Sequence, residues 1–374
     1  MKKTLHAVAT ILGMVIGAGV LGIPYAFAKS GIIYGLINLL LVGSFITIIN
    51  LQLGEVILRT KGKHQLTGYA EKYLGKAGKE LMAFSMVIGI YGALIAYLIG
   101  SADTLVSLFG GDHTFYIIVY FILFSPFIYA GIKTISRTET LFMFVKFCCF
   151  VLVILSILPH MHKENIILRE FDPTASFFPF GVVLFSLLGM ASLPEAREAL
   201  GYDTRKFKKV VILASLIPIV IYALFAVSFV AIIGSEISEV ATVSLRYVNL
   251  FSFVVGSFFA LFSMTTAYLA NGLALQEMYN YDYKINKNIA FTLTCFVPLA
   301  LIFLGVKSFI KTLAIGGAFS GGITAFLVTL MFYKAKKNGE RPPEYEIKGN
   351  IFLSAFILII FVLGVIIEIL NIIG

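Results

Sequence analysis

Apolar stretches of about 20 residues recur from one end of this 374-residue chain to the other, separated by short polar segments. Each stretch is long enough to cross the roughly 30 Å of hydrocarbon in a bilayer as an α-helix. Hydrophobic residues make up 59% of the chain and charged residues 13%, against about 45–50% and 25% in a soluble domain. The pattern predicts an all-α integral membrane protein, with residues 1–374 forming one transmembrane domain in the lipid bilayer.

The hydropathy pattern predicts about eleven transmembrane helices. The first stretch follows Met1-Lys2-Lys3 and could pass for a signal peptide, but it is too long and ends at Pro24-Tyr25-Ala26-Phe27 without a small-residue cleavage motif. We therefore interpret it as the first span. The expected spans cover approximately residues 5–28, 32–58, 81–109, 115–132, 140–159, 177–200, 208–234, 247–278, 288–306, 309–332 and 349–373.

The distribution of basic residues predicts the orientation of these helices. A net charge of +9 would suggest nucleic-acid binding in a soluble protein. Here most of the 29 Lys and Arg residues lie in alternate loops, on the same side as the N-terminus. Cytoplasmic loops of membrane proteins are enriched in these residues. We expect a multi-pass protein of the cell membrane with a cytoplasmic N-terminus and an external C-terminus, and no nucleic-acid partner.

Nothing in the sequence indicates enzyme chemistry. It contains no phosphate-binding loop, zinc motif or catalytic-triad spacing. Cys148, Cys149 and Cys295 lie inside apolar segments, where a small apolar packing role is expected. We expect no catalytic residues, no metal site and no cofactor.

Two spans are interrupted by glycine and proline in a similar way, the first over Gly17–Pro24 and the sixth over Leu188–Pro194. Spans 2 to 5 are matched in order by spans 7 to 10, and because five is odd the second set enters the membrane from the opposite side. This predicts an inverted-repeat transporter with repeats at 5–159 and 177–332 and an extra helix at 349–373. The alternative is that these glycines only allow close helix packing.

A break in a membrane helix exposes main-chain amides and carbonyls, which are costly in lipid unless protein, water or a ligand satisfies them. Gly17, Gly19 and Gly22 allow the chain to turn and a ligand to approach without a Cβ in the way. Amides at the start of a half-helix attract an anion. Carbonyls around Phe185 to Gly189 can accept from an ammonium group. The two breaks together suit a zwitterionic amino acid.

Three segments carry a family resemblance. The run from Gly17 to Phe27 (GAGVLGIPYAF), followed by Ser30-Gly31, looks like the first-helix signature of the amino acid/auxin permease family, within the amino acid–polyamine–organocation superfamily. Residues 185–194 are similar to its second signature, and residues 265–275 resemble its aromatic-amino-acid permease branch.

The resemblance implies the leucine-transporter-like fold, with five helices and five inverted ones, helices 1 and 6 broken, and alternating access for amino acids. It also implies where the substrate binds: Gly17, Ala18, Gly19 and Val20 at the carboxylate, Phe185 over the substrate, and Ser186 and Gly189 at the ammonium end. On the third span, Tyr91 and Tyr97 are candidates for a hydroxyl facing this site, unless they are interfacial or core tyrosines.

Lys146 is the candidate coupling residue, because an ammonium within a span is costly unless it meets a polar cavity. Proton-coupled relatives in the superfamily carry a lysine on the fifth helix where sodium-coupled ones hold an ion, and Lys146 looks like that lysine. It would then lie between the carbonyls of Gly13 and Ile16 and the hydroxyls of Thr265 or Thr266. One alternative is that Lys146 extends to the cytoplasmic surface. Another is that the four other residues form a Na⁺ site, unless both hydroxyls bond back to their helix.

We therefore expect a transporter that imports neutral amino acids, with H⁺ as the coupling ion and Na⁺ as the alternative. A non-transporting amino-acid sensor of the same fold is the second hypothesis. The absence of a clear mid-membrane acid near the breaks favours neutral over cationic substrates. Glu55, Glu195 and Glu277 lie near cytoplasmic helix ends with basic neighbours, so we expect capping or ion-pairing roles for them.

Overall fold

The structure is a computed structural model that describes residues 2–166, 168–201 and 203–373; the side chains of residues 2, 132–143, 163 and 371–373 are outside the description. All regular structure in these ranges is helical. The α-helices are α1 (Lys2–Val15), α2 (Gly19–Ser30), α3 (Ile32–Arg59), α4 (Leu66–Phe109), α5 (His113–Ala130), α6 (Ile132–Ile157), α7 (Pro173–Phe177), α8 (Pro179–Leu187), α9 (Leu193–Leu200), α10 (Phe207–Ile233), α11 (Leu250–Glu277), α12 (Lys287–Phe303), α13 (Phe309–Asn338) and α14 (Ile351–Ile373). Short 3₁₀ turns join several of them, and a π-helical turn, Met278–Asp282, follows α11.

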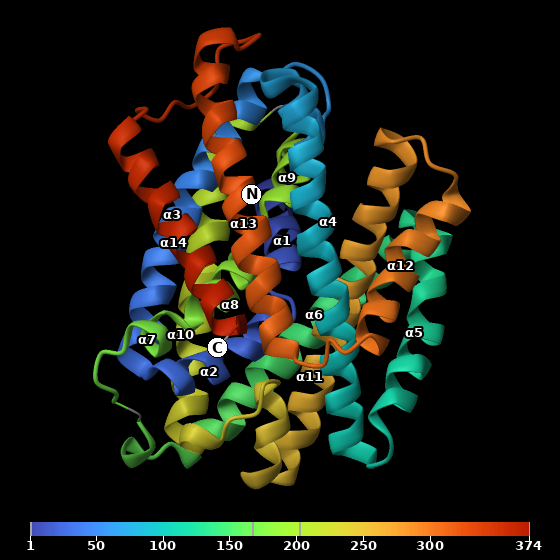
Figure 1. Cartoon of the computed structure of the whole chain (residues 1–374), viewed down its shortest axis with the longest axis vertical. Helices are drawn as coiled ribbons and strands as arrows, with labels where there is room; N and C mark the ends of the chain where they lie inside the picture. The colour runs from blue at the N-terminus through green and yellow to red at the C-terminus, as the bar shows by residue number, and fades with distance from the viewer. Residues whose placement is uncertain (1, 167, 202, 374) are drawn as a thin grey trace.

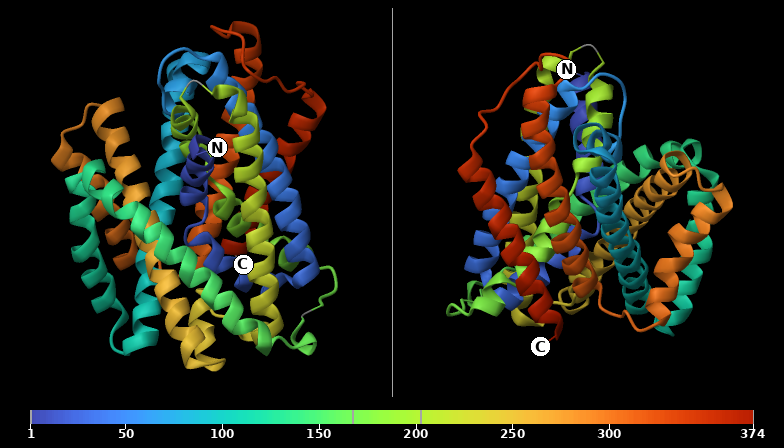
Figure 2. Two further views of the ribbon diagram at one scale, coloured as in Figure 1. Left: turned by 180° about the vertical axis from the view of Figure 1, so that it is seen from behind. Right: turned by 45° about the horizontal axis from the view of Figure 1, so that its top comes forward.

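The number of spans agrees with the prediction within the described residues. Eight helical segments are long and apolar enough to cross a membrane. The bent pair α1 and α2 forms one more, and two shorter apolar helices, Phe144–His160 and Lys287–Phe303, account for the remaining predicted spans. The chain is thus a multi-pass, all-helical membrane protein. The start of α1 and the end of α14 lie toward opposite ends of the molecule (Figure 2), as an odd number of spans requires.

The two broken spans lie inside the bundle. The first half of span 1, α1, packs against α9, the second half of span 6, while α2 packs against α8. The two spans therefore run in opposite directions. Helix α4 packs along α13, and α11 along both α4 and α6. Helices α5 and α12 lie at one side of the bundle and α3 and α14 at the other (Figure 1). The proposed internal repeat stays a prediction, although this antiparallel pairing agrees with it.

Some helices extend beyond the expected spans. Helix α4 begins at Leu66, fifteen residues before the expected start at 81, and changes direction at Gly75, where φ is +77°. In this first part Tyr69, Ala70 and Tyr73 are buried, while the Lys and Glu side chains lie mostly on the other faces. Mean hydropathy detects helices that are apolar on all sides and misses this amphipathic one.

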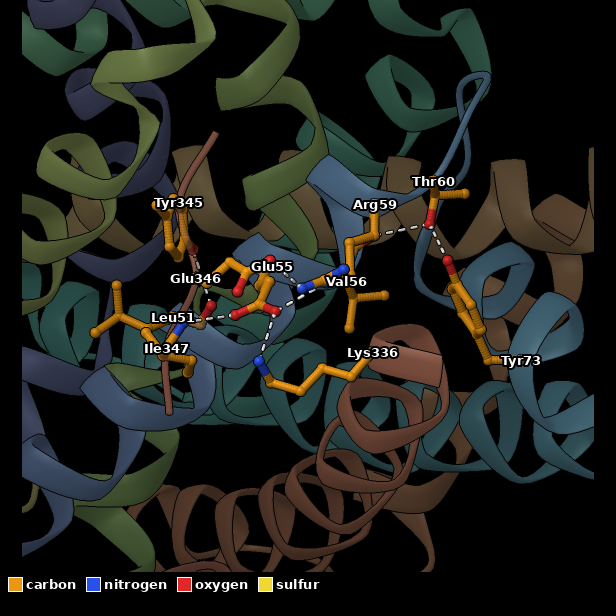
Figure 3. Close-up of polar contacts among 10 residues, drawn as sticks. All are labelled: Leu51, Glu55, Val56, Arg59, Thr60, Tyr73, Lys336, Tyr345, Glu346 and Ile347. Atoms are coloured by element: carbon orange, nitrogen blue, oxygen red, sulfur yellow. Dashed lines mark hydrogen bonds and ion pairs between the residues drawn. The ribbon is translucent and has the colours of Figure 1, made fainter. Parts of the chain in front are cut away.

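The basic segments that follow α3, α9 and α13 meet at one end of the molecule, which we call the basic end. There Lys63 pairs with Glu198, and the segment 339–350 between α13 and α14 binds across α3. The Glu55 carboxylate, fully buried at the end of α3, accepts from Arg59 Nε at 2.8 Å and the Ile347 N–H at 2.7 Å and lies 3.2 Å from Lys336 Nζ (Figure 3). The expected ion-pairing role of Glu55 is confirmed.

Candidate functional site

The break in span 1 covers three residues, between the end of α1 at Val15 and the start of α2 at Gly19. The two half-helices are bent by 56° relative to each other. The Gly17 N–H turns back to the Val15 carbonyl at 2.9 Å. Ala18, the residue before α2, makes no side-chain capping hydrogen bond, so the first amides of α2 carry the positive partial charge of a helix N-terminus.

The break in span 6 follows α8, which ends at Leu187. Leu188 is extended (ψ 110°), and a 3₁₀ turn from Met190 to Ser192 leads into α9. The Ser192 hydroxyl donates to the Gly189 carbonyl at 2.7 Å, which satisfies one of the freed carbonyls. The two breaks touch each other, because a Cβ placed on Gly19 would lie 2.4 Å from Ser186 Oγ.

A cavity of about 110 Å³ lies between the breaks. Its wall is formed by both broken spans and by α4, α11 and α13. The lining residues are Met14, Val15, Gly17, Gly19, Leu66, Met86, Gly89, Ile90, Ala93, Tyr97, Phe185, Ser186, Leu188, Gly189, Met190, Ala191, Asn271, Ala274, Ser320 and Thr324. None of these is Asp, Glu, Lys, Arg or His, so the described wall is uncharged and mostly apolar, with a few hydroxyl and amide groups.

Six of the nine predicted substrate residues line this cavity: Gly17, Gly19, Tyr97, Phe185, Ser186 and Gly189. Ala18 and Val20 are fully buried beside it and present no side chain to it. The Tyr97 side chain is 4% exposed, and its hydroxyl is 3.9 Å from the position of a Cβ on Gly17. Within the described residues that hydroxyl makes no hydrogen bond to protein.

The structure does not bring Tyr91 to the cavity. Its hydroxyl donates to the Leu293 carbonyl at 2.9 Å and lies 3.2 Å from the Tyr279 hydroxyl. Tyr97 follows Tyr91 by six positions, which at about 100° per residue places the two side chains about 120° apart around α4. Only one of the two can face the breaks, and Tyr91 faces α12 instead.

Lys146 reaches the first break from α6. Its Nζ donates to the Ile16 carbonyl at 2.8 Å, and the residue is 5% exposed. The side chain is therefore buried in the protein and does not extend to the surface. Gly13 lies in α1, three residues before Ile16, and is half-buried. The ammonium thus meets a carbonyl that the break has freed from the α1 ladder.

The two threonines have protein partners. Thr265 Oγ1 lies 2.8 Å from the Tyr120 hydroxyl of α5. Thr266 Oγ1 donates to the Ser263 carbonyl of its own helix at 3.1 Å, which is the back-bonded arrangement considered above as the alternative for Thr266. A Na⁺ ion at this place would have to share these hydroxyl oxygens with their present donors and acceptors.

The comparison with known proteins decides the family. The family model described as "Tryptophan/tyrosine permease family" matches residues 1–370. The chain belongs to the tryptophan/tyrosine permease family. The resemblance noted from the motifs was to the related amino acid/auxin permease family, and that name is not the one confirmed.

Curated relatives of this permease are themselves transporters by name. "Glutamine transporter 2" of Aliivibrio fischeri is 24% identical over 353 residues, covering 90% of each chain. "Tyrosine-specific transport system 1" of Haemophilus influenzae is 24% identical over 389 residues, covering 98% of this permease and 96% of the relative. "Amino acid transporter AVT3A" of Arabidopsis thaliana is 26% identical over 256 residues, which is 63% of this permease and 59% of the relative.

Several lining residues of this permease were missed in the sequence. On α4, Met86, Ile90, Ala93 and Tyr97 follow the helical period and share a face. Had Tyr97 been preferred to Tyr91 in the sequence, this face of α4 would have been identified. On α11 and α13 the missed residues are Asn271, Ala274, Ser320 and Thr324. They are small or singly polar, and in sequence they look the same as residues at any helix–helix contact.

Proposed function

We propose that this permease is a secondary active transporter that imports neutral amino acids by alternating access, with a proton as the coupling ion and Lys146 as the coupling residue. The single observation that carries the proposal is the cavity enclosed by two helix breaks. Main-chain groups freed deep in a membrane protein persist where protein, water in a cavity or a ligand satisfies them.

The two breaks offer complementary groups to an amino acid. Its carboxylate would bind the uncapped amides at the start of α2, near Gly17 and Gly19. Its ammonium would face the carbonyl end of α8, near Ser186. The side chain would then lie among Met86, Ile90 and the other apolar residues of α4.

The uncharged lining favours a neutral side chain, because a charged one would be desolvated without a counter-charge. Two relatives carry glutamine and tyrosine in their names, and both amino acids have uncharged side chains near neutral pH. Asn271, Ser320 and Thr324 supply hydrogen-bonding groups for the polar tip of such a side chain.

The direction in which the cavity extends supports one of the conformations through which an alternating-access transporter passes. Its lining extends from the breaks toward the basic end, through Leu66, Ala191, Ala274 and Thr324. At the other end Glu239 accepts from the Ser308 hydroxyl and the Ile310 N–H, which ties the segment after α10 to the start of α13. With the basic end in the cytoplasm, as the Lys and Arg distribution predicts, this is an inward-facing conformation.

The position of Lys146 supports proton coupling. A buried ammonium that donates to the Ile16 carbonyl stabilises the broken end of α1. Loading and unloading this proton would therefore change how the two halves of span 1 are held. Substrate binding and protonation act on the same break.

Uptake into proteoliposomes tests the proposal. Radiolabelled L-glutamine and L-tyrosine should accumulate when an inward pH gradient is imposed, and Lys146→Ala should lose accumulation while keeping exchange across equal pH. The matched control is Lys208→Ala, because Lys208 is exposed at the start of α10; it should behave like the parent chain. Full proton-driven accumulation in Lys146→Ala would remove Lys146 from the mechanism.

The same assay separates the alternatives. Accumulation driven by Na⁺ alone, and abolished in Thr265→Val, would select the sodium symporter. Saturable binding of either amino acid with no uptake or exchange under any gradient would select the sensor.

A further inference from the structure

Tyr222, on α10, connects the two breaks. Its side chain is fully buried. Its hydroxyl lies 2.7 Å from the Val15 carbonyl at the end of α1 and 3.0 Å from the Ser186 carbonyl near the end of α8. These carbonyls belong to spans that lie far apart in the sequence, and each is at the end of a half-helix, where it carries negative partial charge.

The hydroxyl has one proton for two acceptors. The Val15 carbonyl already accepts from the Gly17 N–H at 2.9 Å. The Ser186 carbonyl has Tyr222 as its donor among the described residues, and a carbonyl has room for a second donor. Because Ser186 also lines the cavity, that second donor can come from a bound ligand.

The Val15 carbonyl is next to the one that holds Lys146. Lys146 Nζ donates to Ile16 and Tyr222 to Val15, so two consecutive carbonyls freed by the same break are satisfied by an ammonium from α6 and a phenol from α10. Tyr222 thus contacts a residue that lines the cavity, Ser186, and a carbonyl next to the one that Lys146 contacts.

We propose that Tyr222 is a positioning residue, which holds the two breaks in register and couples occupancy of the Ser186 carbonyl to the end of α1. The inference rests on the proposed function. When the ammonium of a bound amino acid donates to the Ser186 carbonyl, the Tyr222 hydroxyl donates its hydrogen bond to the Val15 carbonyl alone, and the end of α1 is held more firmly beside Lys146. In the protein without substrate, the hydroxyl shares its hydrogen bond between the two carbonyls.

Equilibrium binding of radiolabelled L-glutamine or L-tyrosine, whichever the parent takes up, tests this in the purified full-length chain. Tyr222→Phe should raise the Kd about tenfold, because the ring remains and one hydrogen bond to two buried carbonyls is lost. The matched control is Tyr268→Phe, since Tyr268 is equally buried and its hydroxyl contacts Ser125 at 2.8 Å, away from the cavity. It should bind within about twofold of the parent.

A double-mutant cycle with Lys146→Ala gives a readout that a merely structural role would not change. The combined loss of affinity should differ from the product of the single losses by about threefold or more, as for residues that share a network. An unchanged or tighter Kd in Tyr222→Phe, or single effects that multiply, would overturn the inference.

Two further outcomes keep the test decisive. If Tyr222→Phe is not recovered folded, Tyr222→4-aminophenylalanine takes its place; it retains an N–H donor at the end of the ring and should bind within about threefold of the parent, and tenfold weaker binding would refute the inference. A parent chain that neither binds nor transports either amino acid refutes the proposed function, and this inference with it. A parent that binds, with Tyr222→Phe unchanged, refutes this inference alone.

Discussion

Two buried ionisable side chains, Glu55 and Lys146, are held in different ways. Glu55 is 0% exposed and accepts from Arg59 and a backbone N–H, with Lys336 close by (Figure 3). Lys146 is 5% exposed and donates to a backbone carbonyl at a helix break. The first contact neutralises charge with charge and joins α3, α13 and the segment before α14. The second is with a dipole that the fold leaves at the edge of a cavity. Under the proposed function, the difference separates a charge that holds the structure from one that responds to a ligand.

The largest loss of stability should follow Glu55→Gln. The change keeps the shape of the side chain but leaves Arg59 and Lys336 beside an uncharged amide, and breaking a buried ion pair costs about 3 kcal/mol or more. Thermal melting in detergent should show a clearly lower midpoint, whereas transport by the surviving folded fraction is retained. A melting temperature equal to that of the parent would show that the Glu55 contacts are not structural.

Gly19→Ala should have the next largest effect, and on the other region. A methyl group there would lie 2.4 Å from Ser186 Oγ and 2.7 Å from Ser186 Cα, so the two breaks must move apart. Overpacking of this kind costs about 1–3 kcal/mol, and uptake should be lost as well. Gly322→Ala is the control, since its added Cβ would lie 3.5 Å from Val365 Cγ2, an ordinary contact; its stability should stay within about 1 kcal/mol of the parent and its uptake should be preserved. Normal uptake by Gly19→Ala would mean that the contact between the breaks is dispensable.

Lys146→Met should change stability least among these buried positions. Replacing a buried ammonium by an apolar chain of similar length removes its desolvation cost together with its hydrogen bond to the Ile16 carbonyl, so we expect a change within about 1 kcal/mol. Melting curves measure this, and uptake measurements should show that proton-driven accumulation is lost. If Lys146→Met melted as low as Glu55→Gln, the distinction between the two charges would fail.

The smallest effect concerns Glu340, in the same segment as the Glu55 contacts but at the surface. It accepts from the Lys61 N–H at 2.7 Å and lies 2.6 Å from Lys72 Nζ. The Lys72 ammonium, with the Lys61 N–H, holds the pKa of Glu340 below its ordinary value of 4.5. A carboxyl whose pKa is lower in the folded state stabilises the fold above its unfolded pKa, and this contribution is lost as the pH falls through the lowered pKa.

The midpoint difference between the parent and Glu340→Gln should therefore be small, fully present above pH 4.5, and gone at lower pH. Melting curves recorded across this range measure it. A midpoint difference that grows as the pH falls would contradict this prediction.

Much of the fold and part of the site could be predicted from the sequence. Hydropathy gave the spans because hydrocarbon thickness sets helix length, and the clusters at Gly17–Pro24 and Leu188–Pro194 gave the breaks because glycine and proline weaken the helical ladder there. The helix over 66–80 was missed because its Lys and Glu residues lower the mean hydropathy of any window that covers it. Of Tyr91 and Tyr97, periodicity shows that they face different ways but not which one faces the breaks.

The remaining site residues depend on contacts across the fold. Asn271 and Ser320 become lining residues only through the positions of α11 and α13 beside the breaks. Tyr222 has no local signal at all, because nothing near it in the sequence indicates that its hydroxyl meets carbonyls from two other spans.

Helix α13 touches its neighbours through main chain, and this bears on how genetic screens of the protein should be interpreted. A Cβ on Gly317 would lie 2.2 Å from the Gly181 carbonyl oxygen, and one on Gly92 would lie 3.2 Å from the Gly316 Cα. Saturation mutagenesis should therefore show a band of intolerance along this helix. Inactive variants at Gly181 or Gly317 would report the distance between helix axes, whereas under the proposed function those at cavity-lining positions such as Ser320 would report substrate selectivity.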